Sequence, residues 1–276
     1  MSDEKVAAKS EFTLPSLFVD KNTSYHYANH RHSYSEELFR LISDFCKEKL
    51  ENLNLAVDVG CGPGNSTVGF TKHFKQVIGV DISESQIALA PKDIPNCQFK
   101  VGSATDLEFL PAASVDLLSC GLAFNLMPKK EFLAEADRIL KPGGTLAIFG
   151  YSSPRCSDQV MDDLLQWMHD KVIPYVGKEL IEAWELYPDL ELPYPGWIRR
   201  DDLMITQMMS PEGILGLGKL HRRFLIENGH EEINLLPEIE DRMAAALQEI
   251  RQYSDGLDFE MKFKTVVIMG HKPLQC

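Results

Sequence analysis

A glycine-rich turn between two hydrophobic runs constrains this chain more than any other feature. The run Ala56–Val59 leads into the turn, and a second run, Val77–Val80, ends in Asp81, 19 positions after Gly62. The turn has glycine at alternate positions, Gly60, Gly62 and Gly64. This spacing is typical of a β-α-β unit in which a carboxylate meets the ribose of a nucleotide. Glycine is favoured because a side chain would hold a ligand away from the backbone, and because glycine adopts positive φ at little cost.

The residues within the turn separate the known nucleotide-binding patterns. A dinucleotide fingerprint would have glycine at position 65, where this chain has Asn65, and Pro63 lies inside the loop. A phosphate-binding loop would have a lysine after the last glycine, and neither Asn65 nor Ser66 is a lysine. The remaining pattern is Asp-x-Gly-x-Gly-x-Gly, which begins at Asp58.

This pattern resembles the first motif of the class I S-adenosylmethionine-dependent methyltransferases, whose cofactor has ribose and adenine but no phosphate. The segment Gly102–Leu107 resembles the adenine-contacting turn of that family, and Phe132–Gly144 resembles its motif before the fifth strand. The resemblance implies S-adenosyl-L-methionine as cofactor, methyl transfer as reaction and a Rossmann-like fold.

Alternating strands and helices predict an α/β fold with a doubly wound, mostly parallel sheet. We expect seven strands, the last of them antiparallel. The predicted strands are 55–59, 77–81, 97–101, 115–120, 145–149, 202–209 and 259–269. Serine followed three residues later by Glu or Gln predicts helix starts at Ser33 and Ser83, and the second of these helices is expected to end at Pro91. The other predicted helices follow Asn65 and span 128–140, 211–227 and 237–253.

The alternation breaks after Tyr151, where residues 155–198 carry all three tryptophans and helical periodicity with prolines between. We expect this segment to be a helical cap inserted over the active site of a single domain, 1–276. Residues 1–15 are expected to be a flexible tail.

Composition limits the partners of the chain. The formal net charge of −13 disfavours nucleic acid, because that affinity comes from neutralising phosphates. No apolar run approaches 18 residues and the N-terminus has no apolar signal region, so neither a membrane span nor secretion is expected. Six cysteines are scattered without CxxC spacing, which indicates neither a disulfide framework nor a metal site. These features predict a cytoplasmic protein.

Within the large family, the chain resembles the trans-aconitate methyltransferase group of small-molecule enzymes. Tyr27, Arg31 and Tyr34 fit the group's Tyr…Arg-Pro…Tyr-Pro pattern, and Tyr187…Pro193 fits its cap. His32 and Ser35 stand where the group has prolines. Where it usually has Ala-x-His-Trp, this chain has Ala123-Phe124-Asn125-Leu126, so an amide replaces an imidazole.

Most cofactor contacts are predicted from these motifs. Asp81 is expected to bind the ribose, and the resemblance implies that Asp58 orients the glycine loop and the methionine amino group. Ser103 and Ala104 stand near the expected adenine. Asn125 lies at the sheet edge. It either contacts the cofactor or the acceptor there, or is an ordinary polar residue of the loop. The predicted cofactor-binding residues are Tyr27, Arg31, Asp58, Gly60, Gly62, Gly64, Asp81, Ile82, Ser103, Ala104 and Asn125.

Acceptor contacts are predicted from a basic cluster and from the aromatic residues of the cap. Lys219, His221, Arg222 and Arg223 form either a solvated helix face or the site of an anionic acceptor. The aromatic residues of the cap either pack in the hydrophobic core or line the acceptor-binding site. The predicted acceptor-binding residues are Trp184, Tyr187, Arg222 and Arg223.

The leading functional hypothesis is methyl transfer to a carboxylate, which forms a methyl ester and needs no base because carboxylates are ionised at neutral pH. An amine or hydroxyl acceptor would need a base, and His26, His30 and His221 are the candidates. A cofactor-binding protein without catalysis, and a methyltransferase of protein or RNA, remain alternatives. No catalytic residue beyond those that position the reactants is expected.

Overall fold

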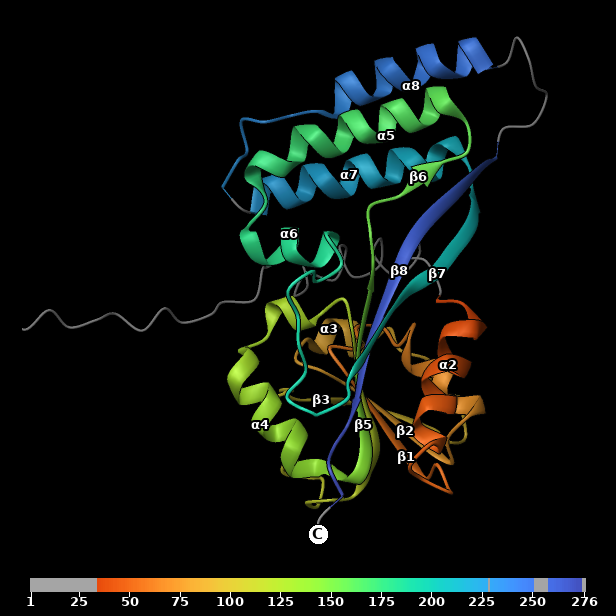
Figure 1. Cartoon of the computed structure of the whole chain (residues 1–276). Helices are drawn as coiled ribbons and strands as arrows, with labels where there is room; N and C mark the ends of the chain where they lie inside the picture. The colour runs from red at the N-terminus through yellow and green to blue at the C-terminus, as the bar shows by residue number, and fades with distance from the viewer. Residues whose placement is uncertain (1–33, 228, 251–257, 275–276) are drawn as a thin grey trace, which may run out of the picture.

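The computed structural model describes residues 34–227, 229–250 and 258–274, without the side chains of Arg223, Phe224 and Glu227. A sheet in the order β3-β2-β1-β4-β5-β8-β6, with β7 paired to β8, forms its centre (Figure 1). The first five strands are parallel, and β8 is antiparallel to both β5 and β7. The strands are β1 Leu55–Val59, β2 Gln76–Asp81, β3 Cys97–Val101, β4 Val115–Gly121, β5 Leu140–Tyr151, β6 Arg155–Cys156, β7 Ile198–Met209 and β8 Phe259–His271.

The predicted fold class is therefore confirmed. Seven of the strands are those predicted, and the eighth, β6, has only two residues. Every residue of β4 is buried, because helices cover both faces of the parallel part of the sheet. α2 and the 3₁₀ turn η2 pack on one face, and α4 and α6 pack on the other (Figure 1).

Helices and 3₁₀ turns alternate with the strands. The α-helices are α2 Glu36–Lys47, α3 Glu84–Ile87, α4 Lys129–Ile139, α5 Gln159–Val172, α6 Lys178–Trp184, α7 Pro211–Glu227 and α8 Leu236–Ile250. The 3₁₀ turns are η2 Thr67–Lys72, η3 Phe124–Leu126 and η4 Ile173–Tyr175.

Three local predictions were wrong. Ser35, rather than Ser33, caps α2, because the Ser35 hydroxyl accepts from the Leu38 N–H at 3.3 Å; Ser33 itself lies outside the described residues. The segment after Asn65 is a 3₁₀ turn rather than an α-helix, and the hydroxyls of Ser66 and Thr67 at its start donate to Asp58 in β1. α3 ends at Ile87, before Pro91.

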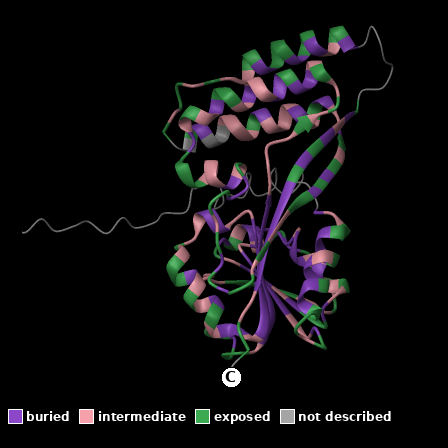
Figure 2. Ribbon diagram, viewed as in Figure 1, coloured by how far each residue is buried: buried purple, intermediate pink, exposed green. Residues whose placement is uncertain are grey.

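α5, α7 and α8 pack together in a helical layer beyond the carboxyl edge of the parallel strands (Figure 1). Residues 155–198 contain α5 and α6. The later helices α7 and α8 pack with α5 to form the layer. β7 and β8 form a long ribbon that reaches it. Buried residues alternate with more exposed ones along the first half of β8, and residues 265–270 of β8 are all buried (Figure 2). The ribbon places the helical layer over the sheet edge where the glycine loop lies.

Candidate cofactor and acceptor site

The three glycines of the loop all have positive φ, and a side chain at each of them would meet different surroundings. A Cβ on Gly60 would lie 2.4 Å from the Cβ of Ala123, and one on Gly64 would lie 2.5 Å from the Phe99 ring. Close packing therefore excludes side chains at both positions. A Cβ on Gly62 would meet only the Oε1 atom of Gln86, at 3.7 Å, among the described residues. The space beside Gly62 is thus open on the side where a ligand would approach.

Asp81 joins the loop to the start of α3. Its Oδ2 atom accepts from the Gly62 N–H at 2.7 Å, and its Oδ1 atom accepts from the Ser83 N–H at 2.9 Å. Each carboxylate oxygen has two lone pairs, so the group can still accept hydrogen bonds from a diol. The ribose role of Asp81 stays a prediction.

Asp58 is fully buried and organises the loop from below. Its Oδ2 atom accepts from the hydroxyls of Ser66 and Thr67, and its Oδ1 atom accepts from the hydroxyl of Ser119, each at 2.7 Å. These bonds stabilise the buried charge and tie the end of the loop to β4. Burial and the charges of Asp58 and Asp81 raise the pKa of the neighbouring Cys61 well above its usual value. Cys61 is therefore a neutral thiol and no nucleophile.

The predicted adenine side lies at the ends of β2 and β3. Ile82 is 52% exposed, and Val101, which pairs with Asp81, is 50% exposed. Such large apolar side chains provide a surface for a flat base. The Ser103 hydroxyl lies 2.8 Å from the Thr105 hydroxyl and accepts from the Thr105 N–H at 3.2 Å. Ala104 is half-buried beside this turn.

Asn125 and Tyr187, predicted for different ligands, are brought together. The Tyr187 hydroxyl donates to the Asn125 Oδ1 atom at 3.3 Å, deep below the surface. Leu186 and Tyr187 both have positive φ, and the Arg199 guanidinium donates to their carbonyls at 2.8 and 2.9 Å. Arg199 thereby holds a backbone conformation that non-glycine residues rarely adopt.

Gln86 is a site residue that sequence reasoning missed. Its N–H bonds to the Ser83 hydroxyl at 3.3 Å, as a capping box requires. The Ser83 N–H, however, donates to Asp81, so the Gln86 side chain does not complete the box. That side chain is 1% exposed, and its Oε1 and Nε2 atoms have no hydrogen-bond partner among the described residues. Glutamine at the box position was the only sequence signal, and it indicated a cap.

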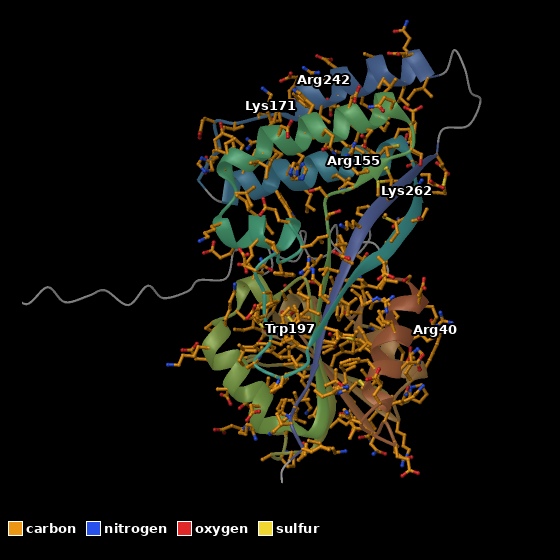
Figure 3. The ribbon with its side chains drawn as sticks, viewed as in Figure 1. Arg40, Arg155, Lys171, Trp197, Arg242 and Lys262 are labelled. Carbon is orange, nitrogen blue, oxygen red and sulfur yellow. The ribbon has the colours of Figure 1, made fainter. Side chains whose placement is uncertain are left out.

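The tryptophans occupy different environments. The Arg242 guanidinium lies over the Trp167 ring at 4.1 Å, and Lys171 approaches the same ring, so Trp167 belongs to the helical layer (Figure 3). Trp197 is partly buried and packs against the hydrophobic core on the face of the sheet that α4 covers. Trp184, at the end of α6, lies beside a polar ring, with its centroid 5.2 Å from that of His169.

Of the predicted arginines, Arg222 has a side chain that the structure describes. The Arg222 Nη2 atom donates to the Glu231 carbonyl at 2.9 Å, and its Nη1 atom is buried without a partner among the described residues. The Arg223 side chain, together with Tyr27 and Arg31, lies outside the described residues. So do His26 and His30.

Across residues 34–227, 229–250 and 258–274, no group of three or more His, Cys, Asp or Glu side chains is arranged to hold a metal ion. In that part of the chain, no helix has the length and apolar composition needed to cross a membrane.

Comparison with known proteins gives a consistent result. Residues 57–148 match the family described as a methyltransferase domain. A Dictyostelium discoideum protein assigned as a methyltransferase is 28% identical over 95% of this chain and 99% of its own length. A trans-aconitate 2-methyltransferase of an Azoarcus species is 33% identical over 48% of this chain and 52% of that protein, so this chain spans about half of it. A solved structure assigned as a type II methyltransferase from Anaeromyxobacter dehalogenans has a TM-score of 0.72 and 25% identity, covering 89% of this chain and 99% of that one.

The site fits a nucleoside ligand without phosphate. Open space beside Gly62, the Asp81 carboxylate and the unpartnered amide of Gln86 converge at the loop. Pro63 removes one of the loop N–H groups that a phosphate would need. Hydroxyl groups of a ribose would satisfy both atoms of the Gln86 amide, which the described residues leave unbonded.

Proposed function

We propose that this chain, a class I S-adenosylmethionine-dependent methyltransferase, methylates a carboxylate group of a small molecule. The reaction class and the cofactor follow from the methyltransferase domain, and the acceptor is the proposal. The product would be a methyl ester.

The chain's own residues divide the work of holding the cofactor. Asp81 and Gln86 would bind the ribose, Gly62 would allow the backbone to approach it, and Ile82 would cover the base. Asp58 keeps the loop in place through its three hydroxyl contacts. When bound, S-adenosylmethionine supplies a transferable methyl group carried on a positively charged sulfur.

The observation that supports a carboxylate acceptor is the free donor of Asn125. Its Nδ2 atom is buried and has no partner among the described residues. The Tyr187 hydroxyl occupies Oδ1, which fixes the amide with Nδ2 as the remaining group. A buried N–H donor without an acceptor is costly, and a carboxylate oxygen would remove that cost.

An amide at this position also suits the chemistry. A carboxylate is ionised at neutral pH, so the site needs a group that orients the acceptor rather than one that removes a proton. The unpartnered Nη1 atom of Arg222 is a second donor suited to an anion. The trans-aconitate 2-methyltransferase relative, whose name describes an acid as substrate, supports the same class.

We further propose that residues 155–198 and α7 cover the acceptor as a cap. The acidic net charge and the helical layer favour a small acceptor over a nucleic acid or protein. The protein would act in the cytoplasm.

The test is a methylation screen that compares carboxylic acids with amines, phenols and thiols. Activity confined to acids is expected. Asn125→Leu should lower kcat/KM for the acid about 10-fold or more, the effect of losing a hydrogen bond to a charged group, while S-adenosylhomocysteine still binds. Tyr187→Phe, which removes only the orienting hydroxyl, should have a smaller effect. Activity restricted to amines or phenols would contradict the proposal and favour a histidine base, and cofactor binding with no methylation of any class would favour a non-catalytic protein.

A further inference from the structure

A second polar cluster lies between the helical layer and the sheet, and the cofactor does not account for it. The His169 Nδ1 atom, on α5, lies 3.0 Å from the hydroxyl of Ser153, which follows β5. The other side of the His169 ring meets Trp184 at the end of α6, with the ring planes inclined by 49°. All three side chains are half-buried.

His221 joins this cluster from α7. Its Nδ1 atom is buried and has no hydrogen-bond partner among the described residues. α7 packs against α5, the helix that carries His169. A buried ring nitrogen without a partner is available to a ligand atom, because buried polar atoms in native proteins are nearly always bonded.

Both imidazoles are neutral at physiological pH. Burial, with a smaller contribution from His169, lowers the pKa of His221 to about 4. Burial lowers the pKa of His169 as well, against the opposing charge of Asp170. A neutral imidazole has one donor and one acceptor, so the pair suits oxygen atoms better than an apolar group.

The position of the cluster is that of an acceptor site. Ser153 follows β5, the strand beside β4, at whose end Asn125 lies. α6, which ends in Trp184, packs against η3, which carries Asn125. α6 therefore links the cluster, through Trp184, to the turn that carries Asn125.

We propose that Ser153, His169, Trp184 and His221 form the acceptor-binding site, and that it takes an organic acid with a second oxygen-bearing group remote from the methylated carboxylate. This inference rests on the proposed function. Asn125 holds the carboxylate that is methylated, and the two imidazoles bind the remote oxygen. An acid with an apolar tail would leave both imidazoles unbonded and would bind more weakly.

The experiment uses three acids of equal chain length: glutarate, 4-oxopentanoate and pentanoate. Each is titrated into the full-length protein saturated with S-adenosylhomocysteine while the imidazole ¹H–¹⁵N resonances are recorded. Resonances are assigned with His169→Gln and His221→Gln. Glutarate and 4-oxopentanoate should shift the His169 and His221 resonances with one common Kd, about 5-fold or more below that of pentanoate. His73 and His271, which lie against Glu36 and Phe45, are internal controls and should not move.

The KM values of two histidine variants provide a second test of the proposed acceptor site. His169→Phe should raise the KM for 4-oxopentanoate or glutarate about 5- to 10-fold without changing the Kd for S-adenosylhomocysteine, and His73→Phe should change neither. Unshifted histidines with all three acids, or equal binding of pentanoate, would overturn the acceptor site. If acids are methylated while these histidines stay unshifted, the proposed function stands and this inference fails. If histidine shifts accompany methylation of phenols or amines only, the carboxylate proposal fails instead.

Discussion

The Gly62 N–H donates to the Asp81 carboxylate at 2.7 Å, joining two residues 19 positions apart. The bond connects the loop after β1 with the end of β2, and a second oxygen of the same carboxylate accepts from the Ser83 N–H at 2.9 Å. One contact thus joins the loop to the carboxylate for which we propose a ribose-binding role.

Replacing Asp81 by Ala should weaken S-adenosylmethionine binding by about 1.5–3 kcal/mol, the usual range for hydrogen bonds to a charged group. That range corresponds to a Kd about 10- to 150-fold higher. The variant also loses the bonds to the N–H groups of Gly62 and Ser83, so a small loss of thermal stability is expected. Calorimetric titration of the folded variant measures the affinity, and an unchanged Kd would exclude the ribose role.

Gly62→Val should abolish cofactor binding by filling the open space at the loop. Gly196 is a matched control, because it also has positive φ and nothing lies within 4 Å of its Cβ position. Valine at either position costs about 1–3 kcal/mol of folding free energy through backbone strain. Binding should be lost only at position 62, and Ala replaces Val if the first variant does not fold. Equal cofactor binding by both variants would remove Gly62 from the site.

Gln86→Met should have two opposite effects. Without ligand, the variant should melt at a higher temperature, because it no longer buries an amide without partners. Its affinity for S-adenosylhomocysteine should fall about 2- to 10-fold, the loss of one or two neutral hydrogen bonds. Gln76→Met, at an exposed position of β2, should change neither quantity. A lower melting temperature with unchanged affinity would make Gln86 a structural residue.

The ion pair between Arg155 and Asp162 should make stability depend on pH. Arg155 (Figure 3) donates from Nε to the Asp162 Oδ1 atom at 2.9 Å and holds the pKa of that carboxyl below its usual value. A lowered pKa in the folded state gives stability that is present above the unfolded value of about 4 and is lost as the pH falls through the folded value. Asp162→Asn should therefore be less stable than the unchanged protein at pH 7, and the difference should shrink below pH 4. Denaturant unfolding at pH 7 and pH 3 measures it, and a difference independent of pH would contradict the assignment.

The sequence predicted the sheet and its loop because those signals are local. Buried strands such as β1 read as apolar runs, and the turn after it shows its geometry through glycine. Ser83 was likewise identified as a cap from the Gln86 three residues later, and its hydroxyl does accept from that N–H. The prediction that Ser33 caps the first helix was wrong, because Ser35, two positions later, is the cap of α2.

Other parts of the site depend on contacts that no local pattern encodes. The bond between Asn125 and Tyr187 joins residues 62 positions apart, through a turn that Arg199 holds from β7. The free amide of Gln86 arises because Asp81 takes the Ser83 N–H. The cluster at His169 needs four separate segments to meet, so single residues such as Trp184 were predicted without their surroundings.

The most direct test of carboxylate methylation is the fate of a labelled methyl group. The protein is incubated with methyl-labelled S-adenosylmethionine and a panel of organic acids, and the products are then treated with mild base. A methyl ester releases its label as methanol, whereas methyl groups on amines and phenols resist base. Label recovered as methanol, at a rate that falls about 10-fold or more in Asn125→Leu, is the predicted result. Label retained after base treatment would contradict a carboxylate acceptor.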